Sequence, residues 1–159
     1  MRTNKADFLK LKYEIMRRGI IAHSEYLTEE NVDVLRGFDF AFLCVDAGVG
    51  KKLVVEKLLE YGVPFIDSGI GVYQSNDSLG GLVRTTSAVG ERSKRSLEEL
   101  SFADGKDEYD RNIQLADLNM LAAALAVIRW KRHMGAYFDF EDEFSSVYTL
   151  DGNHLLNEH

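Results

Sequence analysis

The strongest constraint on the fold is an alternation of short apolar runs with a helical segment over residues 38–67. The run Phe38–Val45 is almost continuously apolar, which predicts a strand covered on both faces. A helical pattern over Gly48–Tyr61 follows, and Val63–Asp67 is predicted to form the next strand. Two strands joined by a helix indicate a parallel pair, so we expect an α/β fold with a Rossmann-like, mostly parallel sheet and crossover helices.

The segments before this alternation predict further elements of the same kind. Apolar spacing over Ala6–Arg18 predicts a helix that ends at Gly19. The short run Ile20–Ala22 is expected to be a strand. A short helix over Glu29–Leu35, capped by Thr28, is expected to follow it.

After residue 67 the pattern changes. Ser68–Tyr73 and Gly81–Thr86 are separated by polar turn residues, which indicates an antiparallel pair. The strongest helical pattern of the chain covers Leu115–Met134 and is apolar around much of its circumference. Tyr137–Phe140 and Ser146–Leu150 are predicted as closing strands, so antiparallel strands and a long C-terminal helix complete the expected fold.

Length and charge exclude several classes of function. The chain has 159 residues and a net charge of −7, which fits one domain that repels nucleic acid. Its apolar runs are far shorter than the roughly 20 residues of a membrane span, and no signal peptide is visible at the start. Cys44 is the only cysteine, which excludes an internal disulfide and a cysteine zinc site. We therefore expect a cytoplasmic protein in which Cys44 is a small core residue.

Asp46 is the residue whose position most suggests chemistry. It follows the most apolar run, and ligands of open α/β sheets bind outside the carboxyl ends of the strands. One carboxylate there can hold Mg²⁺ beside nucleotide phosphates. The alternative is that Asp46 caps the helix that begins near Gly48.

Glycine-rich phosphate loops of the two common types are missing from the sequence. Around Gly48 the Walker pattern fails, because Val45 stands where the first glycine belongs and Lys52 where Ser or Thr belongs. The dinucleotide pattern fails as well, since Leu53 stands at its last glycine position.

The remaining polar candidates have simple structural interpretations. Lys5 begins the first predicted helix and could reach a phosphate, although spacing alone favours a solvated lysine. Four acidic residues form a cluster that is most simply a solvated edge or turn: Asp139, Glu141, Asp142 and Glu143. The four histidines are scattered along the sequence and indicate no metal site.

Four stretches, in order and spacing, carry a resemblance to a known family. They are Gly37–Asp46, Val63–Gly71, Gly81–Thr86 and Asn112–Asn119. Together with the long helix they make most of the chain similar to the ThiF/MoeB/HesA adenylyltransferases, which are relatives of the ubiquitin-activating enzymes.

The resemblance implies an ATP-dependent enzyme that adenylates the C-terminal carboxylate of a ubiquitin-like or sulfur-carrier protein. ATP and Mg²⁺ are the implied cofactors, and a homodimer is the implied assembly. Asp46 matches the family's metal-binding aspartate, and Lys5 matches its phosphate-contacting lysine. Ala47 and Lys51 stand where the family often has Asn and Arg, so the nucleotide contacts are partly altered.

The departures from the family pattern leave a second function open. The family's first strand, glycine-rich loop and ribose-binding acid lie upstream of its lysine. Residues 1–150 are therefore expected to be a partial ThiF-type domain that binds ATP poorly by itself, followed by a polar tail over 151–159. The zinc-binding and thioester-forming cysteines are missing. The alternative is a non-catalytic dimerisation or interaction module, suggested by the apolar helix Leu115–Trp130, and an NAD-dependent enzyme ranks last.

Overall fold

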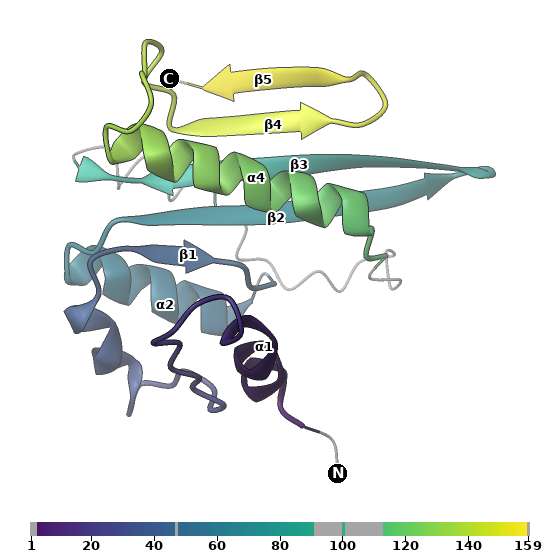
Figure 1. Cartoon of the computed structure of the whole chain (residues 1–159). Helices are drawn as coiled ribbons and strands as arrows, with labels where there is room; N and C mark the ends of the chain where they lie inside the picture. Colours follow the sequence, from purple (N-terminus) through teal and green to yellow (C-terminus); the bar gives the residue numbers. More distant parts are fainter. Residues whose placement is uncertain (1–2, 47, 91–99, 101–112, 159) are drawn as a thin grey trace.

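The computed structural model describes residues 3–46, 48–90, 100 and 113–158. Five strands form one open sheet in the order β1-β2-β3-β4-β5 (Figure 1). The elements, in chain order, are α1 (Lys5–Tyr13), the 3-10 helix η1 (Val32–Gly37), β1 (Ala41–Leu43), α2 (Val49–Glu60), β2 (Phe65–Ser75), β3 (Ser78–Ala88), α4 (Ala116–His133), β4 (Ser145–Thr149) and β5 (His154–Glu158).

The predicted strand–helix–strand unit is confirmed, but the sheet is not mostly parallel. β1 and β2 are parallel and joined through α2, whereas the other three strand pairs are antiparallel. Two of these three antiparallel pairs follow from their short connections. A two-residue turn at Asn76–Asp77 joins β2 to β3, and a short turn over 150–153 joins β4 to β5. Connections this short can only join antiparallel neighbours, since a parallel pair needs a crossover of a dozen or more residues.

The predicted antiparallel pair is present and longer than expected. The segments Val63–Asp67 and Ser68–Tyr73 belong to one continuous strand, β2. Asn76 has a φ of 53°, the left-handed conformation that tight hairpin turns require. The long hairpin extends well beyond the body of the sheet in Figure 1.

Two predicted strands are wrong, and one strand was missed. Ile20–Ala22 and Tyr137–Phe140 are irregular. The second of these has no place beside β4, because β3 and β5 occupy both edges of that strand. The supposed polar tail forms β5 instead. A turn over 151–153 precedes this strand, and the apolar pair Leu155–Leu156 after the turn is typical of a hairpin.

The helices match their predictions unevenly. α2 and α4 agree to within one or two residues, and Gly62 and Gly135 follow them with φ of +67° and +72°, as C-terminal glycines do. α1 ends well before Gly19, and the helix expected over Glu29–Leu35 is a 3-10 turn that begins later. None of the helices in the described ranges is both long enough and apolar enough to cross a membrane.

α4 covers one face of the sheet. Its Leu118 and Ala122 pack with Val83 of β3, and Ser68 of β2 donates a hydrogen bond to the Ala122 carbonyl oxygen at 3.2 Å. At its other end, Trp130 approaches Phe42 of β1, with ring centroids 6.2 Å apart. One helix therefore spans the width of three strands.

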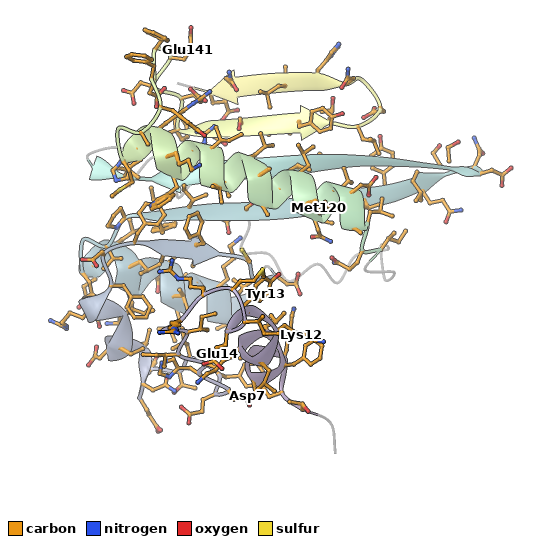
Figure 2. The ribbon with its side chains drawn as sticks, viewed as in Figure 1. Asp7, Lys12, Tyr13, Glu14, Met120 and Glu141 are labelled. Carbon is orange, nitrogen blue, oxygen red and sulfur yellow. The ribbon has the colours of Figure 1, made fainter. Side chains whose placement is uncertain are left out.

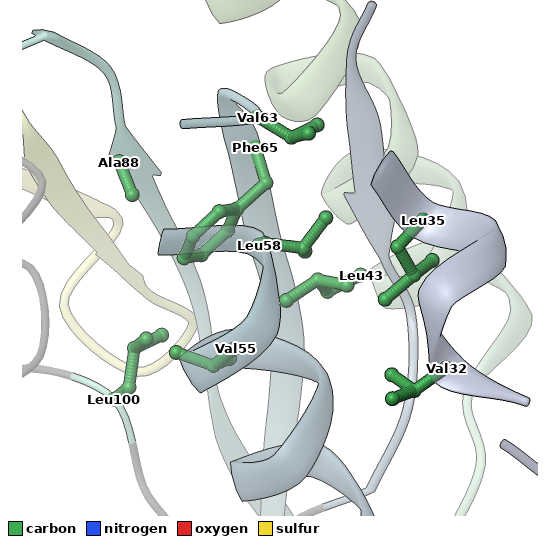
Figure 3. Packing of buried hydrophobic residues seen from close by; sticks show 9 residues of the cluster. All are labelled: Val32, Leu35, Leu43, Val55, Leu58, Val63, Phe65, Ala88 and Leu100. Atoms are coloured by element: carbon green, nitrogen blue, oxygen red, sulfur yellow. The ribbon is translucent and has the colours of Figure 1, made fainter. Parts of the chain in front are cut away.

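α2 and η1 cover the opposite face near β1 and β2. Side chains alternate between faces along a strand, so Phe65 and Asp67 of β2 point toward α2, whereas Ile66 and Ser68 point toward α4. Figure 3 shows the resulting core, which joins the sheet, α2 and η1. Its nine buried residues are Val32, Leu35, Leu43, Val55, Leu58, Val63, Phe65, Ala88 and Leu100.

Candidate functional site

The carboxyl ends of the two parallel strands bring polar side chains together. Leu43 of β1 lies opposite Asp67 of β2, so Cys44 and Asp46 continue the chain past that level. Asp67 stands two residues after Phe65 and therefore faces α2. This is the region where ligands of open α/β sheets bind.

Lys51 of α2 and Asp67 form a buried ion pair. The Lys51 Nζ lies 2.7 Å from Oδ1 and 2.8 Å from Oδ2 of Asp67. Their side chains are only 5% and 2% exposed. Sequence reasoning named Lys51 but missed Asp67. Asp67 could have been found from the sequence. A charge on the inner face of a buried strand requires a partner, and Lys51 lies at the start of the helix that covers this strand.

Asp46 is exposed and does not cap α2. The N-cap of α2 is Gly48, with a φ of 144°, and no side chain forms a capping hydrogen bond there. The capping alternative for Asp46 is therefore wrong. Among the described residues, no hydrogen bond or ion pair engages its carboxylate, which faces solvent beside the positive end of the α2 dipole.

Cys44 is exposed, so the expectation of a buried core cysteine is wrong. Although the residue as a whole is accessible, partial desolvation of the thiol raises the pKa of Cys44. The negative charge of Asp67 raises it further, and the positive charge of Lys5 opposes both effects. The charges of Lys5 and Asp67 therefore both act on the Cys44 thiol at this end of the sheet.

Lys5 reaches this region from the first turn of α1. Asn4 caps that helix through its side-chain oxygen, which accepts a hydrogen bond from the Ala6 N–H at 2.9 Å. Lys5 is exposed and lines an open hollow of about 390 Å³. Its other lining residues include His23, Ser24, Glu25 and Tyr26 from the irregular segment after α1.

The structure thus places the charges of Lys5 and Asp67 near Cys44, pairs Lys51 with Asp67, and leaves Asp46 just beyond β1. Ala47, the fourth sequence candidate, lies outside the described residues. Within the described part of the chain, no group of three or more His, Cys, Asp or Glu side chains could hold a metal ion. A metal at Asp46 would need ligands from elsewhere, such as a nucleotide's phosphates and water.

The comparisons with known proteins leave the family open. No model of a known protein family matches the chain, and no curated protein matches it. The likeness to the ThiF/MoeB/HesA adenylyltransferases accordingly stays a prediction from the sequence.

The electrostatic coupling at this site predicts how the Cys44 thiol titrates. Its alkylation by iodoacetamide should have a midpoint pH above that of a cysteine in an unstructured peptide. Lys5→Ala removes a positive charge, so it should raise the midpoint further, and Asp67→Asn should lower it. Lys12→Ala, which removes a positive charge farther along α1, is the matched control and should change nothing. A Lys5→Ala midpoint equal to that of the unaltered protein would contradict the position of Lys5.

Proposed function

We propose that this chain supplies the metal and lysine contacts of an ATP-dependent enzyme that adenylates the C-terminal carboxylate of a ubiquitin-like or sulfur-carrier protein. The observation that carries the proposal is the position of Asp46. It is exposed at the carboxyl end of a parallel strand, beside the uncapped start of α2, and no described side chain engages it. The proposed architecture is the Rossmann-like core of the ThiF/MoeB/HesA family, with the antiparallel β3–β5 added to it.

The residues present fit Mg²⁺ bound together with ATP. Mg²⁺ prefers oxygen ligands and commonly takes only one or two carboxylates from a protein, with phosphates and water completing the octahedron. Asp46 supplies one such carboxylate. The first N–H groups of α2 have no side-chain cap, which makes this helix end favourable for a phosphate.

Lys5 and Lys51 have different roles in this proposal. Lys5 is exposed and flexible enough to place its ammonium beside phosphate oxygens as a point charge. The ammonium of Lys51 is held by Asp67, so it would reach a phosphate only by leaving a buried carboxylate unpaired. We therefore assign Lys51 mainly to positioning the start of α2.

The chemistry requires positioning and charge stabilisation rather than a protein nucleophile. A carboxylate oxygen of the substrate attacks the α-phosphorus of ATP, and pyrophosphate leaves. The bound metal would offset charge on the phosphates. Lys5 contributes further positive charge.

A Mg-ATP titration followed by two-dimensional NMR tests this site. We expect weak binding, because the sequence has no glycine-rich phosphate loop, with the largest shifts at Lys5, Cys44 and the start of α2. Asp46→Ala should abolish the Mg²⁺-dependent part of these shifts. Asp39→Ala, an exposed carboxylate at the other end of β1, should leave them unchanged.

The reaction itself is tested by ATP–pyrophosphate exchange in a polypeptide that includes this chain. Loss of the metal ligand should lower the exchange rate by about a hundredfold or more, the size seen when a stabilising contact to the transition state is removed. Exchange left intact by Asp46→Ala, or tight Mg-dependent ATP binding that ignores the substitution, would refute the assignment.

A second candidate function, a dimerisation module, is favoured by the outer face of α4. Met120, Val127 and Ile128 are 72%, 42% and 40% exposed. Ala123 and Ala124 lie exposed between them, so this face is apolar over about two turns (Figure 2 labels Met120). An exposed apolar surface of this kind often marks a protein interface.

Sedimentation equilibrium tests the dimer. The unaltered chain should associate, and Val127→Asp should shift it toward monomer by burying a charge in the interface. Val34→Asp on η1 is the matched control, since Val34 has a similar exposure of 44%. A monomer at every concentration would contradict the second candidate.

A further inference from the structure

Two phenylalanine rings project into solvent from the segment between α4 and β4. Phe138 and Phe140 are 85% and 88% exposed. Their rings stack on each other, with centroids 5.6 Å apart and an interplanar angle of 19°. Phe144, which follows in the same segment, is buried. The stack is therefore a local surface feature and not part of either core.

The segment is fixed to the C-terminal end of α4. The N–H groups of Gly135 and Ala136 donate to the carbonyl oxygens of Arg132 and Lys131 at 2.9 and 2.8 Å. The ammonium of Lys131 lies 5.2 Å from the ring centroid of Tyr137. These contacts set the direction in which the chain leaves the helix.

The other end of the segment is held by a buried carboxylate. Arg129 donates to the Glu143 carbonyl oxygen at 2.6 Å and to Ser146 Oγ at 2.9 Å, and Arg132 pairs with the Glu143 carboxylate. The Glu143 side chain is only 6% exposed, so the expectation of a fully solvated acidic turn is wrong for this residue. With both ends held, the rings are presented with little ordering left to lose on binding.

Acidic residues alternate with and follow the two phenylalanines along the chain. Asp139, Glu141 and Asp142 are exposed, and Asp139 Oδ1 accepts a hydrogen bond from the Asp142 N–H at 3.0 Å. Figure 2 shows Glu141 at the end of the molecule opposite α1. Negative charge here disfavours nucleic acid and anionic lipid, and it favours a basic protein segment.

Aromatic faces together with carboxylates favour an arginine side chain over a lysine side chain. Arginine has a planar guanidinium that stacks on aromatic rings and pairs with carboxylates through two parallel hydrogen bonds, whereas lysine offers a point charge. We propose that the Phe138–Phe140 stack, with its flanking carboxylates, is a docking site for an arginine-rich segment of a partner protein. This site is independent of the nucleotide site, which lies at the ends of β1 and β2.

Fluorescence anisotropy with a short labelled peptide of alternating arginine and leucine tests the proposal. The intact chain should bind the peptide, and Phe138→Ser with Phe140→Ser should weaken binding by about tenfold or more. Tyr26→Ser, at an aromatic residue that is 92% exposed, should leave the affinity unchanged.

A charge-matched pair of variants separates this site from general attraction to an acidic protein. Neutralising Asp139, Glu141 and Asp142 with Asn or Gln should weaken binding, whereas neutralising the exposed Glu29, Glu30 and Asp77 should not. Equal loss in both variants would overturn the proposal, as would binding of a glutamate–leucine peptide with equal affinity or no binding of the arginine peptide.

Three further measurements would reveal a different role for the stacked rings. The same double serine variant should keep the melting temperature of the parent, and a clear drop would assign the rings to a core and overturn the proposal. Binding to phosphatidylcholine vesicles in place of the peptide would overturn it in favour of a membrane. A self-association lost only in the double serine variant would overturn it in favour of a second copy.

Discussion

The buried Lys51–Asp67 ion pair is the interaction on which the arrangement around the strand ends depends. It joins the first turns of α2 to the parallel end of β2, with both carboxylate oxygens within 2.8 Å of the ammonium. Either charge left alone in this position would be strongly destabilising, so the two elements must stay in register. The start of α2 is thereby placed beside β1, and Asp46 is left free of a capping role.

β2, the second strand of the sheet, connects this region to the rest of the molecule. Its alternate side chains enter two separate cores, one beneath α2 and η1 and the other beneath α4. Its parallel edge holds β1 and the candidate nucleotide site, and its antiparallel edge begins the run of β3, β4 and β5. The aromatic segment after α4 lies at the far side of that run, which is why the two proposed sites use different surfaces.

Local sequence patterns predicted most helices and strands correctly. The predictions failed where a segment becomes a strand only if another strand pairs with it. The α2 and α4 periodicities, the β2–β3 hairpin and the βαβ unit were all visible in the sequence. The run Ile20–Ala22 also has a strand's composition, but none of the described strands pairs with it. β5 was missed because every residue of His154–Glu158 lies exposed, and the strand gains its structure from pairing with β4.

The residues of the candidate site also divide into those that the sequence indicated and those that only the structure revealed. Asp46 was predicted from its place after an apolar strand, and Lys5 from the resemblance to the adenylyltransferases; whether they bind a nucleotide stays a prediction. The role of Asp67 needed the register of β1 and β2 together with the direction of α2. Cys44 was expected to be buried because its strand is apolar, yet β1 ends at Leu43 and leaves the cysteine exposed.

A double-mutant cycle on the ion pair, measured by urea unfolding, tests the account most directly. Lys51→Met or Asp67→Leu alone should lower the free energy of unfolding by about 3–5 kcal/mol, because each leaves a buried charge unpaired. The double variant should lose clearly less than the sum, with a coupling energy of about 1–3 kcal/mol. Additive losses would contradict the claim that this pair fixes the start of α2 against the sheet.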